Sequence, residues 1–150
     1  ITYSAVVSAC EKGGEWARAL VLLAEAARGG LQVDTITYNA AISACAKGGE
    51  WASALELIGA MSRGRAAMDT ITYNAGISAC EKGCQWARAS QLLREMEGCS
   101  VEADTITYNA AISACSASGE WGRALELRDG MARGGVKMNT ITYNALISAC

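Results

Sequence analysis

The sequence predicts an all-α fold, an α-solenoid in which helix-turn-helix repeats stack into a right-handed superhelix. Three observations support this prediction. The phrase "ITY", followed by serine or asparagine, recurs every 35 residues along the 150-residue chain. Within each copy the apolar residues follow helical spacing in two separate stretches, divided by a glycine-containing break. A period of this length is typical of solenoids, in which no repeat buries its apolar face alone and neighbouring repeats must stack.

The repeats divide the chain into a single array. Aligned on the recurring phrase, the predicted units are 1–34, which lacks its first residue, 35–69, 70–104 and 105–139, followed by the partial repeat 140–150. Because the chain begins and ends inside repeats, we expect it to be an excerpt of a longer protein, with any targeting sequence outside it. The printed sequence contains no signal peptide and no apolar run long enough to span a membrane.

The first predicted helix of a repeat, taken from the second copy, begins behind Asp34 and Thr35. Either side chain can accept from the free amide groups of an opening helical turn. The apolar stripe of this helix then follows at Tyr38, Ile42 and Cys45. These positions fall at i, i+4 and i+7 and therefore share one face. The glycine pair at 48–49 ends the helix.

The second predicted helix opens near Glu50 and ends around Arg63 and Gly64, and a short connector leads to Asp69. Its apolar face consists of Trp51, Ala54, Leu55, Ile58 and Met61. Tryptophan and methionine recur at these places in the other complete repeats. Apolar residues at helical spacing are typical of packing, so we expect both series to be core residues and not a ligand site.

Composition argues against metal or catalytic chemistry. The chain has no histidine, which removes the commonest metal ligand and the commonest general base at neutral pH. Of its seven cysteines, five share one place in the repeat, without the C-x-x-C spacing of zinc sites. We predict that these five are small core residues, reduced in an intracellular compartment, and we expect no metal and no cofactor. The net charge of −2 does not by itself indicate a nucleic-acid partner.

A different face of the first helix carries side chains that packing does not explain. In the second repeat it consists of Ile36, Asn39, Ser43 and Lys47, in steps of three, four and four residues. The third repeat has the same four residue types, the first repeat replaces the asparagine with serine, and the fourth replaces the lysine with Ala117. We call this the polar face. Stacking aligns it into rows, and the Asp or Asn that closes each repeat approaches the asparagine row from the adjoining unit.

The segment "TITYNAAISACAKGGEWASALELIGAMSRG…D" resembles the pentatricopeptide repeat, whose familiar form has T-Y-N-x-L-I, then K-x-G, then A-L-x-L-x-x-M, and a closing D or N. The match covers the whole chain. Proteins of this family bind single-stranded RNA and recognise one base per helical repeat through two or three side chains. The resemblance therefore implies sequence-specific RNA binding in organellar RNA metabolism (processing, stability, editing or translation), in a chloroplast or mitochondrion.

The resemblance also assigns roles to residues of the polar face. The implied base-reading pairs are Ser4 with Asp34, Asn39 with Asp69, Asn74 with Asp104, and Asn109 with Asn139, and Asn144 opens a fifth. The implied base-clamping residues are Ile1, Ile36, Ile71, Ile106 and Ile141. The implied phosphate contacts are Lys12, Lys47 and Lys82. By the family's pairing rule the four pairs favour 5′-GUUC-3′, with the last base able to relax to give 5′-GUUU-3′.

Two other classes of function fit the sequence less well. A protein-binding scaffold of the tetratricopeptide type has a 34-residue period and a tryptophan in its first helix. This chain has a 35-residue period and its tryptophan in the second helix, which favours RNA, although protein partners are left open. An enzyme is not expected, because the sequence lacks a phosphate-binding P-loop and paired carboxylates in a plausible cleft. No membrane partner is expected.

Overall fold

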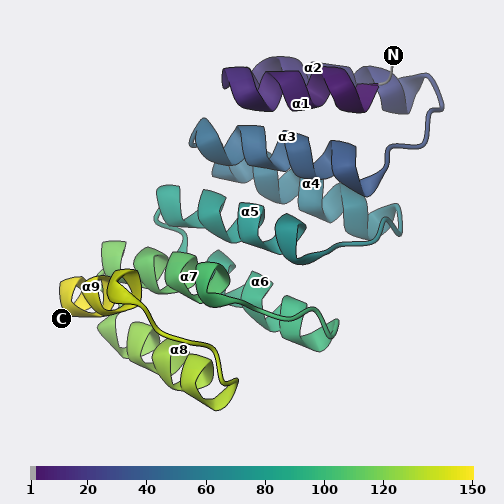
Figure 1. Cartoon of the computed structure of the whole chain (residues 1–150). Helices are drawn as coiled ribbons and strands as arrows, with labels where there is room; N and C mark the ends of the chain where they lie inside the picture. Colours follow the sequence, from purple (N-terminus) through teal and green to yellow (C-terminus); the bar gives the residue numbers. More distant parts are fainter. Residues whose placement is uncertain (1–2) are drawn as a thin grey trace.

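The structure, a computed structural model, describes residues 3–150 and consists of helices joined by short turns and connectors (Figure 1). The helices are α1 (Tyr3–Gly13), α2 (Trp16–Arg28), α3 (Thr35–Lys47), α4 (Trp51–Arg63), α5 (Thr70–Lys82), α6 (Trp86–Gly98), α7 (Thr105–Ala117), α8 (Trp121–Arg133) and α9 (Thr140–Ala149). No strand occurs between residues 3 and 150. The predicted all-α solenoid is confirmed.

The first helices begin where the sequence places their capping residues. Asp34 precedes α3, and its Oδ1 accepts from the backbone nitrogen of Thr37 at 2.9 Å. Asp69 caps α5 in the same way, and its own backbone nitrogen donates to the hydroxyl of Thr72, which completes a capping box. Such caps satisfy amide groups that an opening helical turn leaves without partners. The capping residue of each repeat therefore belongs structurally to the helix that follows it.

The break between the two helices of a hairpin depends on a residue in the left-handed region. Gly14, Gly49 and Gly119 take φ values of 71°, 76° and 72° there, a conformation that glycine adopts without steric cost. In the third hairpin the same place is held by Cys84, with a φ of 54°. A side chain in this region costs roughly 1–2 kcal/mol. The turn thus keeps one backbone geometry even where the glycine is lost.

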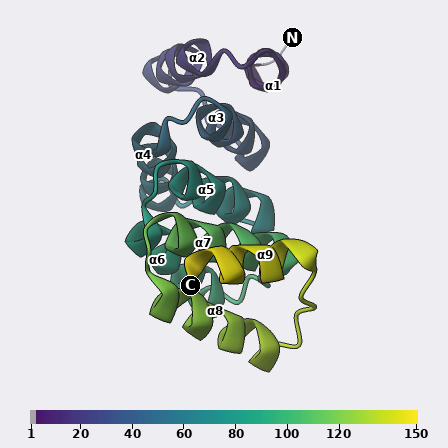
Figure 2. The ribbon, with the colours of Figure 1, turned by 90° about the vertical axis from the view of Figure 1, so that its left-hand side faces the viewer.

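The hairpins stack in two layers (Figure 2). Helices α1, α3, α5, α7 and α9 pack on one another in sequence, and each also packs on its neighbouring second helices. Successive second helices, α2, α4, α6 and α8, bring no Cα atoms within 8 Å of one another. The first-helix layer is therefore the closely packed, inner side of the stack. The polar face lies on helices of this layer.

The core runs between the layers as a continuous row. The methionines Met61, Met96 and Met131 are fully buried, as are the first-helix isoleucines Ile42, Ile77 and Ile112. The recurring cysteines at positions 10, 45, 80 and 115 are also buried. Cys150, the last residue of the sequence, is exposed. Small residues at these places let neighbouring first helices approach closely. The predicted packing role of the methionines and of these four cysteines is confirmed.

The tryptophans are less buried than the sequence suggested. Trp16, Trp51 and Trp86 are half-buried, and Trp121 is 57% exposed. The rings of Trp16 and Trp51 cover the turn of the next hairpin: a Cβ placed on Gly48 would lie 2.4 Å from Cδ1 of Trp16, and one placed on Gly83 would lie 2.2 Å from Cδ1 of Trp51. The described residues contain no further hairpin turn that could cover Trp121. The prediction that all four are core residues is therefore wrong for Trp121 and too strong for the others.

We predict that Trp51→Ala lowers the free energy of unfolding by about 2 kcal/mol, roughly half the cost of deleting a fully buried tryptophan. Trp121→Ala is the matched control, because the same side chain there has no turn to cover. Its effect should stay within about 0.5 kcal/mol. Urea unfolding followed by circular dichroism measures both, and equal losses would contradict the account of inter-hairpin packing.

Candidate nucleic-acid interface

The structure brings the two members of three of the four proposed base-reading pairs into contact across neighbouring hairpins. Nδ2 of Asn39 on α3 donates to Oδ1 of Asp69 at 3.1 Å. Asn74 and Asp104 make the same contact at 3.5 Å, and Asn109 and Asn139 make it at 3.1 Å. The closing residue of one repeat thus holds the asparagine of that repeat while it caps the next helix.

A threonine hydroxyl completes this network. Oγ1 of Thr72 lies 2.6 Å from Oδ1 of Asn39 and 2.9 Å from Oδ1 of Asp69. A hydroxyl has one proton, and the asparagine oxygen is the nearer acceptor. Exchanging the oxygen and nitrogen of Asn39 would bring two oxygens together at Asp69. The network therefore fixes the orientation of the asparagine amide.

The same arrangement recurs along the stack. Thr107 donates to Asn74, and Thr142 donates to Asn109, each at 2.5 Å. Asn39 and Asn109 are only 8% exposed, and Asn74 is half-buried. These asparagines are therefore not solvated helix-start residues. Asn144 is exposed, because no hairpin follows it in the described structure to supply an aspartate and a threonine.

The capping carboxylates are held in their ionised form. Burial alone would raise the pKa of Asp69, but hydrogen bonds from Thr72 and Asn39 outweigh it and leave the pKa below its ordinary value. Asp104 follows the same pattern, and hydrogen bonds from Thr37 lower the pKa of Asp34. At neutral pH these side chains are anions that can only accept hydrogen bonds.

The isoleucines of the polar face stand in solvent although they are large and apolar. Ile36, Ile71, Ile106 and Ile141 are 68%, 64%, 67% and 60% exposed, and Ile1 lies outside the described residues. Ile36 and Ile71 line one cavity of about 250 Å³ together with Asn39 and Asp69. Ser4 and Asp34 line another, of about 400 Å³, beside α1. A flat ring held between two isoleucines could therefore reach the amide and the carboxylate.

The three lysines are exposed near the ends of their first helices, but their surroundings differ. Nζ of Lys47 lies 3.1 Å from Oε1 of Glu11 on the preceding hairpin. Nζ of Lys82 reaches only the carbonyl oxygen of Lys47, at 3.5 Å. Lys12 forms no ion pair with any residue from 3 to 150. The roles of Glu11 and Thr72 could not be predicted from the sequence, since they depend on contacts between residues more than 30 positions apart, although threonine recurs in "TIT".

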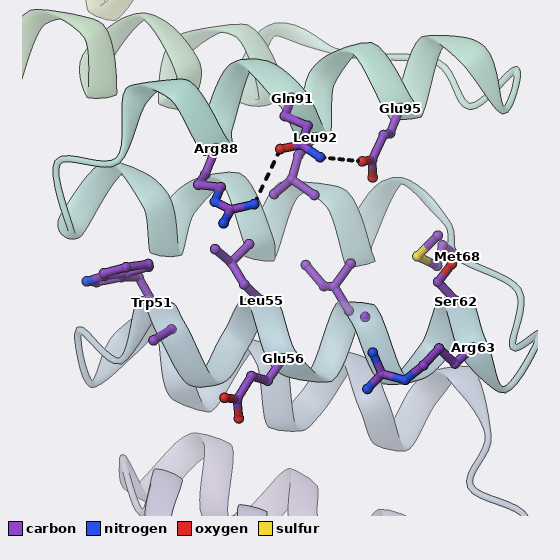
Figure 3. Close-up of a pocket in the computed structure, with 13 residues that line it drawn as sticks. Trp51, Leu55, Glu56, Ser62, Arg63, Met68, Arg88, Gln91, Leu92 and Glu95 are labelled. Carbon is purple, nitrogen blue, oxygen red and sulfur yellow. Dashed lines mark hydrogen bonds between the residues drawn. The ribbon is translucent and has the colours of Figure 1, made fainter.

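A further cavity of about 480 Å³ lies between α4 and α6, on the second-helix side (Figure 3). Trp51, Leu55 and Leu92 line it, and Gln91 joins Arg88 and Glu95 through hydrogen bonds. Across the described part of the chain, no three potential metal ligands lie close enough to hold an ion. None of the helices between residues 3 and 150 combines the length and hydrophobicity needed to cross a bilayer.

Comparison with known proteins gives consistent results. The model of the PPR repeat family matches residues 33–82, 68–116 and 103–150, and a second PPR repeat model matches residues 1–31. No curated protein matches the chain.

Among solved structures, the PPR domain of Arabidopsis thaliana protein-only RNase P 1, in complex with tRNA, is similar with a TM-score of 0.88 at 19% identity. The match covers 99% of this chain and 80% of that one. PPR10 in complex with an 18-nucleotide psaJ RNA element matches with a TM-score of 0.82 at 26% identity. A structure of PPR10 from maize matches with a TM-score of 0.77 at 29% identity. The matches cover 98% and 99% of this chain but only 22% and 21% of the PPR10 chains.

We predict that Thr72→Val lowers the free energy of unfolding by about 1–3 kcal/mol, because the buried oxygen of Asn39 loses its donor. Thr70→Val is the matched control on the same helix, since its hydroxyl makes only a long contact of 3.4 Å to the carbonyl of Glu102. Thermal unfolding of the two variants distinguishes them. A loss no larger for Thr72→Val than for Thr70→Val would show that the network does not stabilise the stack.

Proposed function

Because the chain belongs to the pentatricopeptide repeat family, we propose that it binds single-stranded RNA along the polar face, one base per repeat. We propose the repeats 1–34, 35–69, 70–104 and 105–139 as the binding units, with 140–150 opening a fifth. The function is recognition and not catalysis, and it serves organellar RNA metabolism in a chloroplast or mitochondrion. The RNA complexes of PPR10 and of the RNase P domain support the general activity.

The proposal depends on one observation. The hydrogen bonds among the asparagine, the threonine and the closing Asp or Asn leave one polar group of that closing residue available to a ligand. Oδ1 of Asp69 already accepts from the backbone nitrogen of Thr72 and from Nδ2 of Asn39. Its Oδ2 has no hydrogen bond to any residue from 3 to 150 and remains an acceptor. At Asn139, Oδ1 is occupied in the same way, so the remaining group is the Nδ2 donor. The change from Asp to Asn therefore presents a hydrogen-bond donor to the base in place of an acceptor.

This difference between a free acceptor and a free donor supports the base assignments. The N3–H group of uracil can donate to the free oxygen of Asp69 or Asp104, whereas N3 of cytosine is an acceptor that matches the free amide of Asn139. The second N–H of each asparagine can donate to a pyrimidine carbonyl oxygen. With the family's preference for guanine at the Ser4 and Asp34 pair, the proposed core is 5′-GUUC-3′, or 5′-GUUU-3′ where the last base relaxes.

The remaining roles follow the arrangement of the polar face. We assign the exposed isoleucines 36, 71, 106 and 141, with Ile1 by resemblance, to clamping of base faces. Burial of apolar surface there would stabilise the complex by roughly 25 cal/mol per Å². We assign the exposed lysines to the RNA backbone, where each phosphate contact releases counterions.

We predict that Asp69→Asn moves the preference at the second base from uracil to cytosine and leaves the other three bases unchanged. The discrimination should be about 1–3 kcal/mol, by loose analogy with direct readout in DNA. Asn139→Asp is the reciprocal variant and should move the fourth base from cytosine to uracil. Fluorescence anisotropy with labelled RNAs that differ at one base measures both.

Two results would contradict different parts of the proposal. Failure of the wild-type chain to bind any single-stranded RNA would exclude RNA binding as its function. Binding without a change of preference in either variant, or a change at another base, would leave RNA binding intact and exclude the pairing scheme.

A further inference from the structure

A carboxylate lies beside the cation row of the polar face. Oε1 of Glu11 on α1 accepts from Oγ of Ser43 at 2.9 Å and from Nζ of Lys47 at 3.1 Å. Both partners are on the next hairpin. The side chain of Glu11 is 26% exposed and that of Lys47 is 52% exposed. The pair therefore presents almost no net charge to a ligand that approaches α3.

The residue type at the position of Glu11 alternates along the stack. Successive repeats have Glu11, Ala46, Glu81 and Ser116 at this position. Glu11, Ala46 and Glu81 each precede the lysine or alanine of the next hairpin by 36 residues, so Glu11 corresponds to Lys47, Ala46 to Lys82, and Glu81 to Ala117. The glutamates at this position thus correspond to one lysine and one alanine of the next hairpin, and Lys82 corresponds to an alanine of the preceding one.

The structure bears out this difference in the surroundings of each cation. Lys82 forms no ion pair with a described residue and contacts only the carbonyl end of α3. Glu81 precedes Lys82 directly, and adjacent side chains on a helix point in directions about 100° apart, so the charge of Lys82 acts on Glu81 without a direct ion pair between them. Glu81 instead accepts a hydrogen bond from Ser113 on the following hairpin, as Glu11 does from Ser43. Burial raises the pKa of Glu81.

We propose that Glu11 withholds Lys47 from the RNA backbone and that Glu81 leaves the fourth repeat repulsive to it, so that phosphates are held at alternate repeats, by Lys12 and Lys82. This inference rests on the proposed function. It revises both the sequence-based expectation and the assignment of all the exposed lysines under the proposed function, because Lys47 is already paired with Glu11.

The physical reason is counterion release. An isolated lysine that neutralises a phosphate of single-stranded nucleic acid contributes about 0.7 to the slope of log affinity against log salt concentration. A lysine already paired with a carboxylate about 3 Å away neutralises little phosphate charge and so releases few cations from the RNA, because that distance is well inside the Debye length of about 8 Å at physiological salt. A phosphate that approaches Lys47 also meets the charge of Glu11. Lys47 therefore adds little to either affinity or salt dependence.

The experiment measures the affinity of the 150-residue chain for a labelled single-stranded RNA that contains 5′-GUUC-3′, between about 50 mM and about 200 mM salt. Lys82→Ala should weaken binding about 5- to 10-fold at the lower salt and reduce the slope by about 0.7. Lys47→Ala should change the affinity less than about twofold. Glu11→Gln should strengthen binding about 5- to 10-fold and increase the slope by about 0.7, and adding Lys47→Ala to it should abolish that gain.

Glu56→Gln is the matched control, because it removes one exposed negative charge from the second-helix layer, away from the polar face. It should leave the affinity unchanged. Glu81→Gln provides an independent variant and should also strengthen binding. Circular dichroism melts confirm that each variant is folded.

The possible outcomes separate this inference from the proposed function. Equal losses for Lys47→Ala and Lys82→Ala, or no gain from Glu11→Gln and Glu81→Gln in folded proteins, would overturn alternate phosphate contact while RNA binding stands. Equal gains in RNA affinity for Glu11→Gln and Glu56→Gln would show that only the net charge of the chain matters, and this result would also overturn the inference. Absence of RNA binding by the wild-type chain would overturn both.

Discussion

The stack depends on one shared oxygen at the start of each of the helices α5, α7 and α9. Oδ1 of Asp69 accepts from the opening turn of α5 and from Asn39 of the preceding hairpin, and Thr72 of that opening turn donates to the same asparagine. The same set of hydrogen bonds therefore caps the start of the helix and fixes the register between neighbouring hairpins. A shift of α5 along α3 by one residue would break all of them together and leave buried polar atoms without partners.

Much of the fold could be predicted because its causes are local. Capping residues, apolar spacing and the turn glycines act within a few residues, and they gave the helix boundaries almost to the residue. The burial of Trp51 and the orientation of the Asn39 amide were beyond prediction, because they depend on atoms contributed by the next hairpin. The pairing of Glu11 with Lys47 was missed for the same reason. At these places the sequence shows only that a residue type recurs in each repeat. Such recurrence indicates that the position is constrained, but it does not identify the atoms that are in contact.

The quasi-one-dimensional stack also determines how local changes spread. Each hairpin contacts only its neighbours, so the stability of the array is close to a sum of hairpin and interface contributions. The last hairpins illustrate the consequence: Trp121, Tyr143 and Ile147 are 57%, 55% and 73% exposed where no following hairpin covers them. The interior networks at Asn39 and Asn74 do not depend on those end residues. Recognition of one base can therefore change while the other positions keep their geometry.

The charge balance of the chain bears on how selective such recognition can be. A basic protein binds any polyanion through counterion release, and this non-specific affinity competes with base recognition. Here the net charge is −2, and Glu11 further reduces the cation available at α3. Under the proposed function, the hydrogen bonds that a base makes with the free groups of Asp69 and Asn139 consequently supply a larger share of the RNA-binding free energy. A mismatched base removes a contribution of about 1–3 kcal/mol from a smaller total. If the chain binds RNA as proposed, modest affinity and strong discrimination between bases are expected as two consequences of the same distribution of charge.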